Sequence, residues 1–307
     1  MTKGNDIMNA PTVVFAYNRP DHLRRTLSAL AENHGAGDTE VFVFVDGPKN
    51  GSGKAVWEEV ISTAKGFENS FKSMTLKAYE NNKGLAKSVI DGVGEIIEKY
   101  GRVIVVEDDS VSAKSFLNFM NEALGFYEDD PEIWSIGGYT VPMAIPEDYR
   151  HSVIKTGRSS SYAWATWKDR WDKIDWEVSD YGNFKKNFSA RKRFNMWGSD
   201  RSGMLDNQMK GAVNSWAIRF DYAMFKNNMY NIVPVQSLIQ SIGRDGSGTH
   251  DTDKSKKDDF FAAELSGDEI KITPEKVEVD ERIRREFCKP FYLPLSFRAK
   301  EYIKNVL

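Results

Sequence analysis

The fold predicted from the sequence depends most on one stretch, Arg102-Val103-Ile104-Val105-Val106-Glu107-Asp108-Asp109-Ser110. Its apolar, β-branched run is typical of a buried parallel strand, and three acids follow this run directly. Acids at the carboxyl end of such a strand lie in the crevice where open α/β sheets bind their ligands. Because neighbouring carboxylates repel one another, a cation would stabilise them. Carboxylate oxygens suit Mg²⁺ or Mn²⁺, which commonly hold phosphate groups; the alternative is a solvated acidic turn.

Strand and helix patterns alternate on the amino-terminal side of this stretch. Apolar runs predict strands, and the spacing of Leu23, Leu27 and Leu30 after Pro20 predicts a helix. The expected order is strand 12–16, helix from 20, strand 41–45, helix 54–65, strand 73–79, a helix reaching 100, and the strand into the acids. This order predicts an α/β fold with a mostly parallel central sheet flanked by helices. A further strand is expected at 134–139.

The composition of the chain is that of a globular protein. With 40% hydrophobic and 28% charged residues, the 307-residue chain reads as globular, and a net charge of -3 gives no general attraction to nucleic acid. The single cysteine, Cys288, excludes an internal disulfide and fits a reducing compartment. Without a signal peptide or a spanning apolar stretch, we expect a cytoplasmic protein. The segment 282–307 interleaves basic and apolar residues, so it either packs on the domain or makes peripheral contact with the inner face of the membrane.

Three segments outside this alternating pattern also allow structural predictions. Trp164, Trp167 and Trp171 are spaced as on a helix, which predicts a core stripe, with a sugar-stacking platform as the alternative. The basic run 185–193 predicts a solvated helix face. The segment 243–257 is rich in Gly, Ser, Asp and Lys without apolar anchors, so we expect a mobile loop that closes over a ligand and excludes water.

Several short motifs, in their order and spacing, resemble the nucleotide-diphospho-sugar glycosyltransferases of the GT-A fold. The nearest types are N-acetylglucosaminyltransferase I and bacterial polysaccharide glycosyltransferases. The motifs lie at 13–20, 43–47, 82–85, 105–109, 214–219 and 241–250, so the resemblance spans roughly residues 11 to 250. We accordingly expect residues 1–140 to form a Rossmann-like half that binds the nucleotide-sugar. Residues 141–260 would form the acceptor-binding and catalytic half, and residues 261–307 a C-terminal extension.

The resemblance also implies roles for individual residues. The loop after the first strand would contact the base and ribose, Asp46 would accept hydrogen bonds from the base, and Lys83 would lie near the ribose or diphosphate. Asp109 would coordinate Mn²⁺ or Mg²⁺ between the two phosphates, and His250 would close over the diphosphate or complete the metal shell. The full set of implied donor-binding residues is Ala16, Tyr17, Asn18, Arg19, Asp46, Lys83, Glu107 and Asp108.

The sequence departs from the family at the catalytic base. Related transferases commonly carry an aspartate just before the tryptophan that matches Trp216, whereas this chain has Asn214 and Ser215, which are not bases at neutral pH. The nearest acids in sequence are Asp206 and Asp221, and with Arg219 of the matched segment they are the candidate catalytic residues. Two other outcomes stay open: a retaining transfer assisted by the leaving phosphate, and a chain that has lost activity.

The predicted function is therefore a metal-dependent glycosyltransferase. It would move a sugar from a nucleotide-diphospho-sugar to a saccharide or lipid-linked saccharide, with bacterial surface polysaccharide as the expected product. One alternative is a sugar nucleotidyltransferase, although the loop at 15–20 lacks the glycines of that class. A second alternative is a pseudoenzyme that binds a saccharide or nucleotide. A haloacid-dehalogenase-type phosphatase is excluded because it would need its acids on the first strand.

Overall fold

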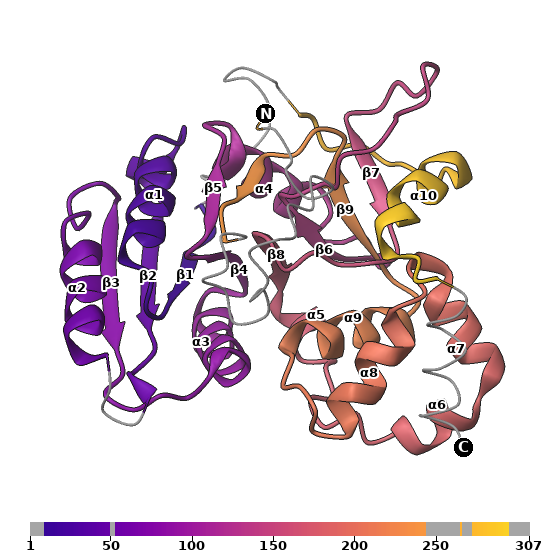
Figure 1. The fold of residues 1–307 in the computed structure, drawn as a ribbon. Helices are drawn as coiled ribbons and strands as arrows, with labels where there is room; N and C mark the ends of the chain where they lie inside the picture. Colours follow the sequence, from indigo (N-terminus) through magenta and orange to yellow (C-terminus); the bar gives the residue numbers. More distant parts are fainter. Residues whose placement is uncertain (1–8, 50–52, 244–264, 266–271, 295–307) are drawn as a thin grey trace.

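The central sheet of the protein has eight strands in the order β3-β2-β1-β4-β8-β6-β9-β7 (Figure 1). The computed structural model describes residues 9–49, 53–243, 265 and 272–294. Strands β3, β2, β1 and β4 are parallel, β8 is antiparallel to β4 and β6, and β7 is antiparallel to β9. The predicted fold class, α/β with a mostly parallel central sheet, is confirmed.

The amino-terminal half follows the predicted alternation of strands and helices. Pro20 begins the first helix, and Leu23, Leu27 and Leu30 are buried on one side of it. The bounds are β1 Thr12–Ala16, α1 Pro20–Ala31, β2 Glu40–Val45, α2 Lys54–Lys65, β3 Ser73–Ala78, α3 Leu85–Tyr100 and β4 Arg102–Glu107. The expected strands and helices of this half are therefore confirmed, with ends that differ by one residue at most.

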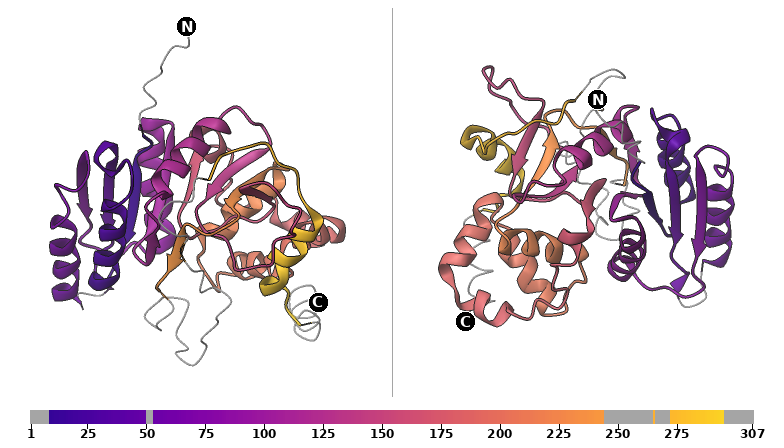
Figure 2. Two further views of the ribbon diagram at one scale, coloured as in Figure 1. Left: turned by 90° about the horizontal axis from the view of Figure 1, so that it is seen from above. Right: turned by 180° about the vertical axis from the view of Figure 1, so that it is seen from behind.

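The second half extends the same sheet and adds a helical layer. Its elements are β5 Ser110–Ser112, α4 Phe116–Phe126, β6 Ile133–Gly137, β7 Val153–Thr156, β8 Trp164–Trp167, α5 Lys168–Trp171, α6 Tyr181–Lys186, α7 Phe188–Phe194, α8 Arg201–Met209, α9 Trp216–Lys226, β9 Tyr230–Pro234, β10 Ile239–Ser241 and α10 Glu281–Cys288. Strands β5 and β10 form a separate two-stranded sheet. The views from two further sides place α2 and β3 at one end of the molecule and helices α6 to α9 at the other (Figure 2).

Both faces of the sheet are covered because successive side chains of a strand point to opposite faces. Val14 of β1 belongs to the hydrophobic cluster that includes residues of α1, α2 and α4, whereas Val13 and Phe15 belong to the cluster that includes residues of α3, α5 and α9. Burial on both faces explains why these strands read as continuous apolar runs. The predicted division of the chain at residues 140 and 260 stays a prediction.

The prediction for the tryptophans is wrong in part. Trp164 and Trp167 lie at the two ends of strand β8, not on a helix, and contribute to opposite faces of the sheet. A spacing of three residues fits a helix, but in a strand it sends the two side chains to different faces. Trp164 stacks on Trp171 and Trp216, with ring centroids 6.1 and 4.9 Å apart. Trp164, Trp167 and Trp171 are buried core residues, which excludes them as a sugar-stacking platform.

The basic run 185–193 forms two short helices instead of one solvated face. Asn187 separates α6 from α7, and its side chain accepts a hydrogen bond from the Ala190 amide at 3.0 Å. Most of the run is exposed, but the Arg191 side chain is only 12% exposed because it pairs with Asp206. The expected solvated face is therefore confirmed only for the remaining basic residues.

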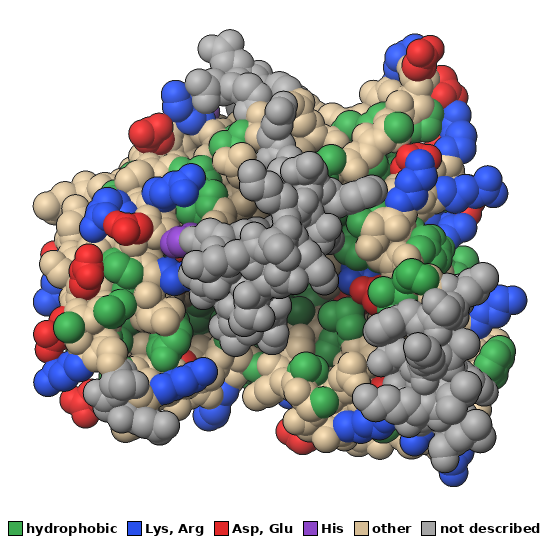
Figure 3. Space-filling model, viewed as in Figure 1, with side chains coloured by type: hydrophobic (Ala, Val, Ile, Leu, Met, Phe, Trp, Pro, Cys, Tyr) green, Lys and Arg blue, Asp and Glu red, His purple; other side chains and the backbone are tan. Residues whose placement is uncertain are grey.

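On the face drawn in Figure 3, acidic and basic side chains are interspersed over the part shown in colour. None of the helices in the described ranges has the length and apolar content needed to cross a bilayer. Of the predicted mobile loop 243–257, residues 244–257 lie outside the described residues.

Candidate functional site

The order of the strands reverses its direction at the carboxyl ends of β1 and β4. The chain runs from β1 to β2 and β3 on one side, then returns through α3 to place β4 on the other side of β1. At such a point the loops that follow the two strands diverge, and open α/β sheets bind their ligands between them. The loop after β1 carries Arg19. The acid cluster Glu107, Asp108 and Asp109 lies at the last residue of β4 and in the turn that follows it.

Arg19 links the two loops. Its Nη2 forms an ion pair with Asp108 Oδ1 and lies 3.0 Å from Asp109 Oδ2. Both aspartates are buried, at 4% and 8% exposed. Helix α1 also holds this corner, because the Thr26 hydroxyl donates to the Asp108 carbonyl at 2.7 Å. The sequence prediction that the loop after β1 and the acid cluster form one site is consistent with this geometry.

Burial and mutual repulsion shift the proton affinities of the cluster. Burial, and then the charges of Asp109 and Asp108, raise the pKa of Glu107 to about 8. Burial also raises the pKa of Asp108 to about 6, although the guanidinium of Arg19 opposes this shift. For Arg19 itself, burial lowers the pKa, but Asp108 and Asp109 more than compensate, and the net direction is upward. Among the residues that the structure describes, three carboxyl groups therefore share the one permanent positive charge of Arg19, which leaves this part of the cluster with a negative excess.

One carboxylate oxygen of Asp109 accepts no hydrogen bond from the described part of the chain. Its Oδ1 is buried and has no hydrogen-bond partner there, whereas Oδ2 faces Arg19. A buried acceptor without a partner is costly, and a carboxylate oxygen in an electron-rich cluster is a good ligand for Mg²⁺ or Mn²⁺. The residues present therefore fit a divalent cation. Within the described ranges no group of three His, Cys, Asp or Glu side chains forms a complete metal site, and His250 lies outside them.

The two residues that follow β10 lie against Asp109 of the acid cluster. The Ile242 amide donates to the Asp109 carbonyl at 2.8 Å. The next residue, Gly243, is so close that a Cβ there would overlap the Asp109 carboxylate and meet Arg19 Nη1 at 3.0 Å. This position needs a glycine because of the close approach, and it is the first residue of the predicted loop 243–257.

Asp46 organises a turn at the neighbouring strand end. Its Oδ1 accepts from the Gly47 and Lys83 amides at 3.0 and 2.8 Å, and its Oδ2 accepts from Asn82 Nδ2 and the Gly84 amide at 3.0 and 2.9 Å. These four bonds fill the acceptor sites of a carboxylate. Asp46 thus holds the turn 82–84 against the end of β2. Its contact with the base, which the resemblance implied, stays a prediction.

The turn presents Lys83 and the beginning of α3. Lys83 Nζ lies 3.6 Å from the centre of the Tyr79 ring and 3.7 Å from Asp91 Oδ2. Gly84 precedes the helix with φ of +79°, a conformation that favours glycine. At the end of β1, Ala16 is buried, and in the loop that follows, Tyr17 is half-buried and Asn18 is exposed.

His22 is a site residue that the sequence analysis missed. Its Nε2 lies 3.2 Å from the Ile242 carbonyl, and its charge lowers the pKa of Asp108. His22 therefore connects the first turn of α1 with the end of β10. Its place three residues after Arg19 was the available signal, because residues three apart on a helical turn lie on the same side.

The two candidate bases are engaged in buried ion pairs. Asp206 on α8 accepts from Arg191 through both oxygens, at 2.8 and 2.7 Å, and from the Tyr181 hydroxyl at 3.0 Å. Asp221 on α9 accepts from Arg201 Nε at 2.7 Å and from the Ser159 amide at 2.9 Å. Neither is a solvated carboxylate, and neither contacts the acid cluster among the hydrogen bonds and ion pairs of the described residues.

Arg219 and its segment also have structural contacts. Arg219 donates to Asn214 Oδ1 at 2.9 Å and to the carbonyls of Ser215 and Trp176 at 3.0 and 3.1 Å. The Ser215 side chain caps helix α9 by accepting from the Ile218 amide. The structure therefore brings together Arg19, the acid cluster and the turn held by Asp46, whereas the hydrogen bonds of Asp206, Asp221 and Arg219 lie within the second half of the chain.

No protein-family model matches the chain. Among solved structures, TarS of S. aureus has a TM-score of 0.46 and 11% sequence identity, with 77% of this chain and 37% of TarS covered. The chain thus spans little more than a third of TarS. The galactosyltransferase LgtC, solved with donor and acceptor sugar analogues, has a TM-score of 0.39 and 10% identity, with 72% of each chain covered. An active-site mutant of LgtC has a TM-score of 0.36, 12% identity and the same coverage. A likeness of this size concerns the course of the chain alone.

Proposed function

We propose that this chain is a metal-dependent glycosyltransferase that uses a nucleotide-diphospho-sugar. The observation that carries the proposal is the buried Oδ1 of Asp109, which has no hydrogen-bond partner among the described residues and lies in an acid cluster that Arg19 neutralises in part. A diphosphate with its divalent cation would supply both the missing charge and the missing partner. The position at the carboxyl ends of β1 and β4 agrees with the general place of nucleotide sites in such sheets.

Asp109 would hold Mg²⁺ or Mn²⁺ through its unpartnered oxygen, with His250 as the proposed second protein ligand. When bound, the cation supplies neutralisation of the charge that develops on the departing diphosphate. Arg19 would contribute a second positive charge, since its guanidinium already faces Asp108 and Asp109. Glu107 and Asp108 would accept hydrogen bonds from ribose or sugar hydroxyls once they are ionised.

The base and ribose would lie over the neighbouring strand ends. Ala16 ends β1, Tyr17 and Asn18 lie in the loop between β1 and α1, and Asp46 fixes the turn that presents Lys83. Lys83 stands over the Tyr79 ring, and an ammonium there attracts a phosphate or the polar edge of a base. Each of these contributions is a proposal from position and chemistry.

The course of the transfer is a separate question. Asp206 and Asp221, proposed as bases from the sequence, are bound by Arg191 and Arg201. A general base must be able to reach and accept a proton from the acceptor hydroxyl. We propose transfer with retained configuration, in which the leaving phosphate assists and neither Asp206 nor Asp221 acts as a base. Determination of the anomeric configuration of the product by NMR tests this directly, because an inverted product would require a base.

The acceptor and the biological setting follow from the resemblance alone. We propose a saccharide or lipid-linked saccharide acceptor, a role in bacterial surface polysaccharide synthesis, and a cytoplasmic location with peripheral membrane contact through the C-terminal segment. The last part of that segment, 295–307, lies outside the described residues.

A screen of sugar nucleotides tests the proposed function. Thermal unfolding is measured with each nucleotide, with and without Mn²⁺, because a bound ligand stabilises the folded state by RT ln(1 + [L]/Kd). Hits are then incubated with saccharide acceptors and the release of nucleoside diphosphate is measured. Transfer supports the proposal. Binding without any transfer or donor hydrolysis favours the pseudoenzyme, and release of pyrophosphate from a sugar phosphate and a nucleoside triphosphate favours the nucleotidyltransferase.

A further inference from the structure

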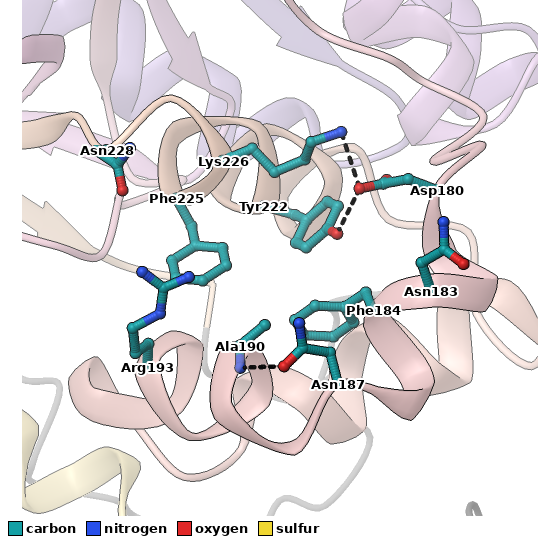
Figure 4. Close-up of a pocket in the computed structure, with 10 residues that line it drawn as sticks. All are labelled: Asp180, Asn183, Phe184, Asn187, Ala190, Arg193, Tyr222, Phe225, Lys226 and Asn228. Atoms are coloured by element: carbon teal, nitrogen blue, oxygen red, sulfur yellow. Dashed lines mark hydrogen bonds and ion pairs between the residues drawn. The ribbon is translucent and has the colours of Figure 1, made fainter.

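The basic run 185–193 is a feature of the second half that the proposed function does not use. Five of its nine residues are Lys or Arg, in a chain whose net charge is -3. No Asp or Glu occurs in the sequence between Asp180 and Asp200. Both of these flanking acids are paired, Asp180 with Lys226 at 2.9 Å (Figure 4) and Asp200 with Arg158 at 2.8 Å. The run is therefore a local positive excess on an acidic protein.

Helix α7 has one buried and one exposed side. Phe194 is buried, and Arg191, three residues before it, is half-buried because of its ion pair with helix α8. The opposite side carries Phe188, Lys192 and Arg193, all of which are exposed. Because residues four apart lie on the same side of a helix, Phe188 and Lys192 are neighbours on the outward side.

Helix α6 has a similar arrangement. The Phe184 ring is buried and points toward Tyr222 of α9 in Figure 4, with ring centroids 4.9 Å apart. Lys186, two residues before Phe188 in the sequence, is exposed. Neither Lys186 nor Lys192 forms an ion pair with another described residue. Their charges are therefore not neutralised within the described part of the chain.

Two large apolar side chains are exposed among these basic residues. Phe188 is 68% exposed, the largest fraction for any large hydrophobic side chain in the described ranges. Met196, two residues beyond the end of α7, is 46% exposed. Basic and apolar side chains together on the outward side of a helix are typical of interfacial helices. The apolar groups of such helices enter the boundary between lipid headgroups and acyl chains.

We propose that this outward surface, formed by Lys186, Phe188, Lys192, Arg193 and Met196, docks on an anionic lipid bilayer. Phe188 and Met196 would enter the acyl boundary, while the three basic side chains would face lipid phosphates. The surface is separate from the C-terminal segment, for which the sequence led us to expect membrane contact. Docking goes beyond the proposed transfer reaction, because it requires neither the donor nor a metal, so either can fail while the other holds.

The apolar side chains favour a bilayer over another polyanion. A nucleic acid would match the positive charge, and a base could stack on Phe188. It has no apolar region for Met196, however. The acyl boundary of a bilayer accepts both side chains, and its anionic headgroups attract the basic residues.

The test measures partition of the full chain onto sedimented unilamellar vesicles in EDTA. Pure phosphatidylcholine is compared with an equimolar mixture of phosphatidylcholine and phosphatidylglycerol, and we expect binding to the mixture alone. Lys186→Gln with Lys192→Gln should lower the partition coefficient roughly twentyfold, because each basic residue near an anionic surface contributes about fivefold. The matched control, Lys54→Gln with Lys65→Gln, removes the same charge from exposed positions of α2 at the other end of the molecule and should change little.

Phe188→Ala tests the apolar contact. We expect the partition coefficient for the mixed vesicles to fall roughly fivefold or more, because the ring leaves water when it enters the bilayer. Phe126→Ala removes an exposed ring from α4 and should bind as the wild type does. Thermal unfolding of each variant confirms that the fold is intact before binding is compared.

Several results would overturn the proposal. Absence of binding to the mixed vesicles, or equal binding to both lipids, would remove the argument from charge. Equal losses in the two lysine variants would indicate a diffuse attraction. Unchanged binding of Phe188→Ala would indicate an ionic surface without insertion, and binding that no variant of α6 or α7 affects would assign the contact to the C-terminal segment. Tighter binding to a single-stranded oligonucleotide than to the vesicles would identify nucleic acid as the partner.

Discussion

Arg19 and Asp109, which come from loops after two different strands, lie 3.0 Å apart between Nη2 and Oδ2. The same guanidinium pairs with Asp108, and the remaining oxygen of Asp109 is buried and has no hydrogen-bond partner in the described ranges. Oδ2 of Asp109 is thus paired with Arg19, while Oδ1 can still accept a contact from a ligand. This asymmetry is the basis for placing a cation and a diphosphate at the carboxyl ends of β1 and β4.

Gly243 should be sensitive to the smallest substitution. In Gly243→Ala the new methyl group would overlap the Asp109 carboxylate, so the acid cluster must shift. A misplacement of about 1 Å in a catalytic site costs on the order of a hundredfold in rate. We expect kcat/KM for the donor to fall by about that factor, while thermal stability changes little. Gly125→Ala is the matched control, because a Cβ there meets nothing within 4 Å; equal activity of the two variants would contradict the close approach.

The acid cluster should make stability depend on pH when no divalent cation is present. The pKa of Glu107 is about 8 in the folded protein and that of Asp108 about 6, both above their ordinary values of 4.5 and 3.8. The folded state therefore binds more protons than the unfolded state between these limits. Linkage then requires the free energy of unfolding to decrease as pH rises through roughly 4 to 8.

Urea unfolding in EDTA at pH 5 and pH 8 measures this dependence. The variant Glu107→Gln lacks the titrating group, so its stability should fall less over the same interval. Addition of Mn²⁺ at pH 8 should restore stability to the wild type more than to the variant. An identical pH dependence in both proteins would show that Glu107 does not hold its proton in the folded state.

Asp46 should affect nucleotide binding through the turn that it holds. In Asp46→Asn an amide group would face N–H donors that now bind a carboxylate oxygen, so at least two of the four hydrogen bonds are lost. Hydrogen bonds to a charged group contribute about 1.5–3 kcal/mol each. We expect the Kd for a nucleoside diphosphate to rise roughly tenfold or more. The exposed Asp129→Asn serves as the control, and an unchanged Kd in Asp46→Asn would separate the turn from the nucleotide site.

Asp206→Asn distinguishes a structural carboxylate from a base. Loss of the buried pair with Arg191 should lower the free energy of unfolding by about 3–5 kcal/mol, because a buried guanidinium loses its counter-charge. Turnover per folded molecule, measured well below the unfolding temperature, should stay within a few-fold of the wild type. A fall of roughly 10²–10⁴ in turnover at unchanged donor affinity would instead identify Asp206 as the general base.

The first half of the fold could be predicted because its signals are local. Buried parallel strands appear as short apolar runs, and Pro20 and the spacing of the leucines that follow it predict helix α1. The acid cluster was also predictable, since its place at a strand end follows from three adjacent letters of sequence. Its connection to Arg19 needed only the expectation that β1 and β4 end at the same edge of the sheet.

The rest depended on contacts between residues far apart in sequence. The sequence around Asp206 is typical of an exposed helix, but in the structure Arg191 of another helix forms an ion pair with Asp206, which is buried. The closeness of Gly243 to Asp109 is set by the pairing of β10 with β5 and has no local signal. For Trp164 and Trp167 the spacing was ambiguous, because three residues apart fits a helix as well as the two ends of a short strand.

The most direct test of the account is the metal dependence of nucleoside diphosphate binding, measured by calorimetry on wild type, Asp109→Asn and the control Asp129→Asn. The account predicts that Mn²⁺ tightens binding strongly in the wild type and in Asp129→Asn, that EDTA removes this gain, and that Asp109→Asn loses it. The same variant should then transfer sugar roughly a thousandfold more slowly. Binding and donor turnover that are unaffected by EDTA and by Asp109→Asn would contradict the central claim.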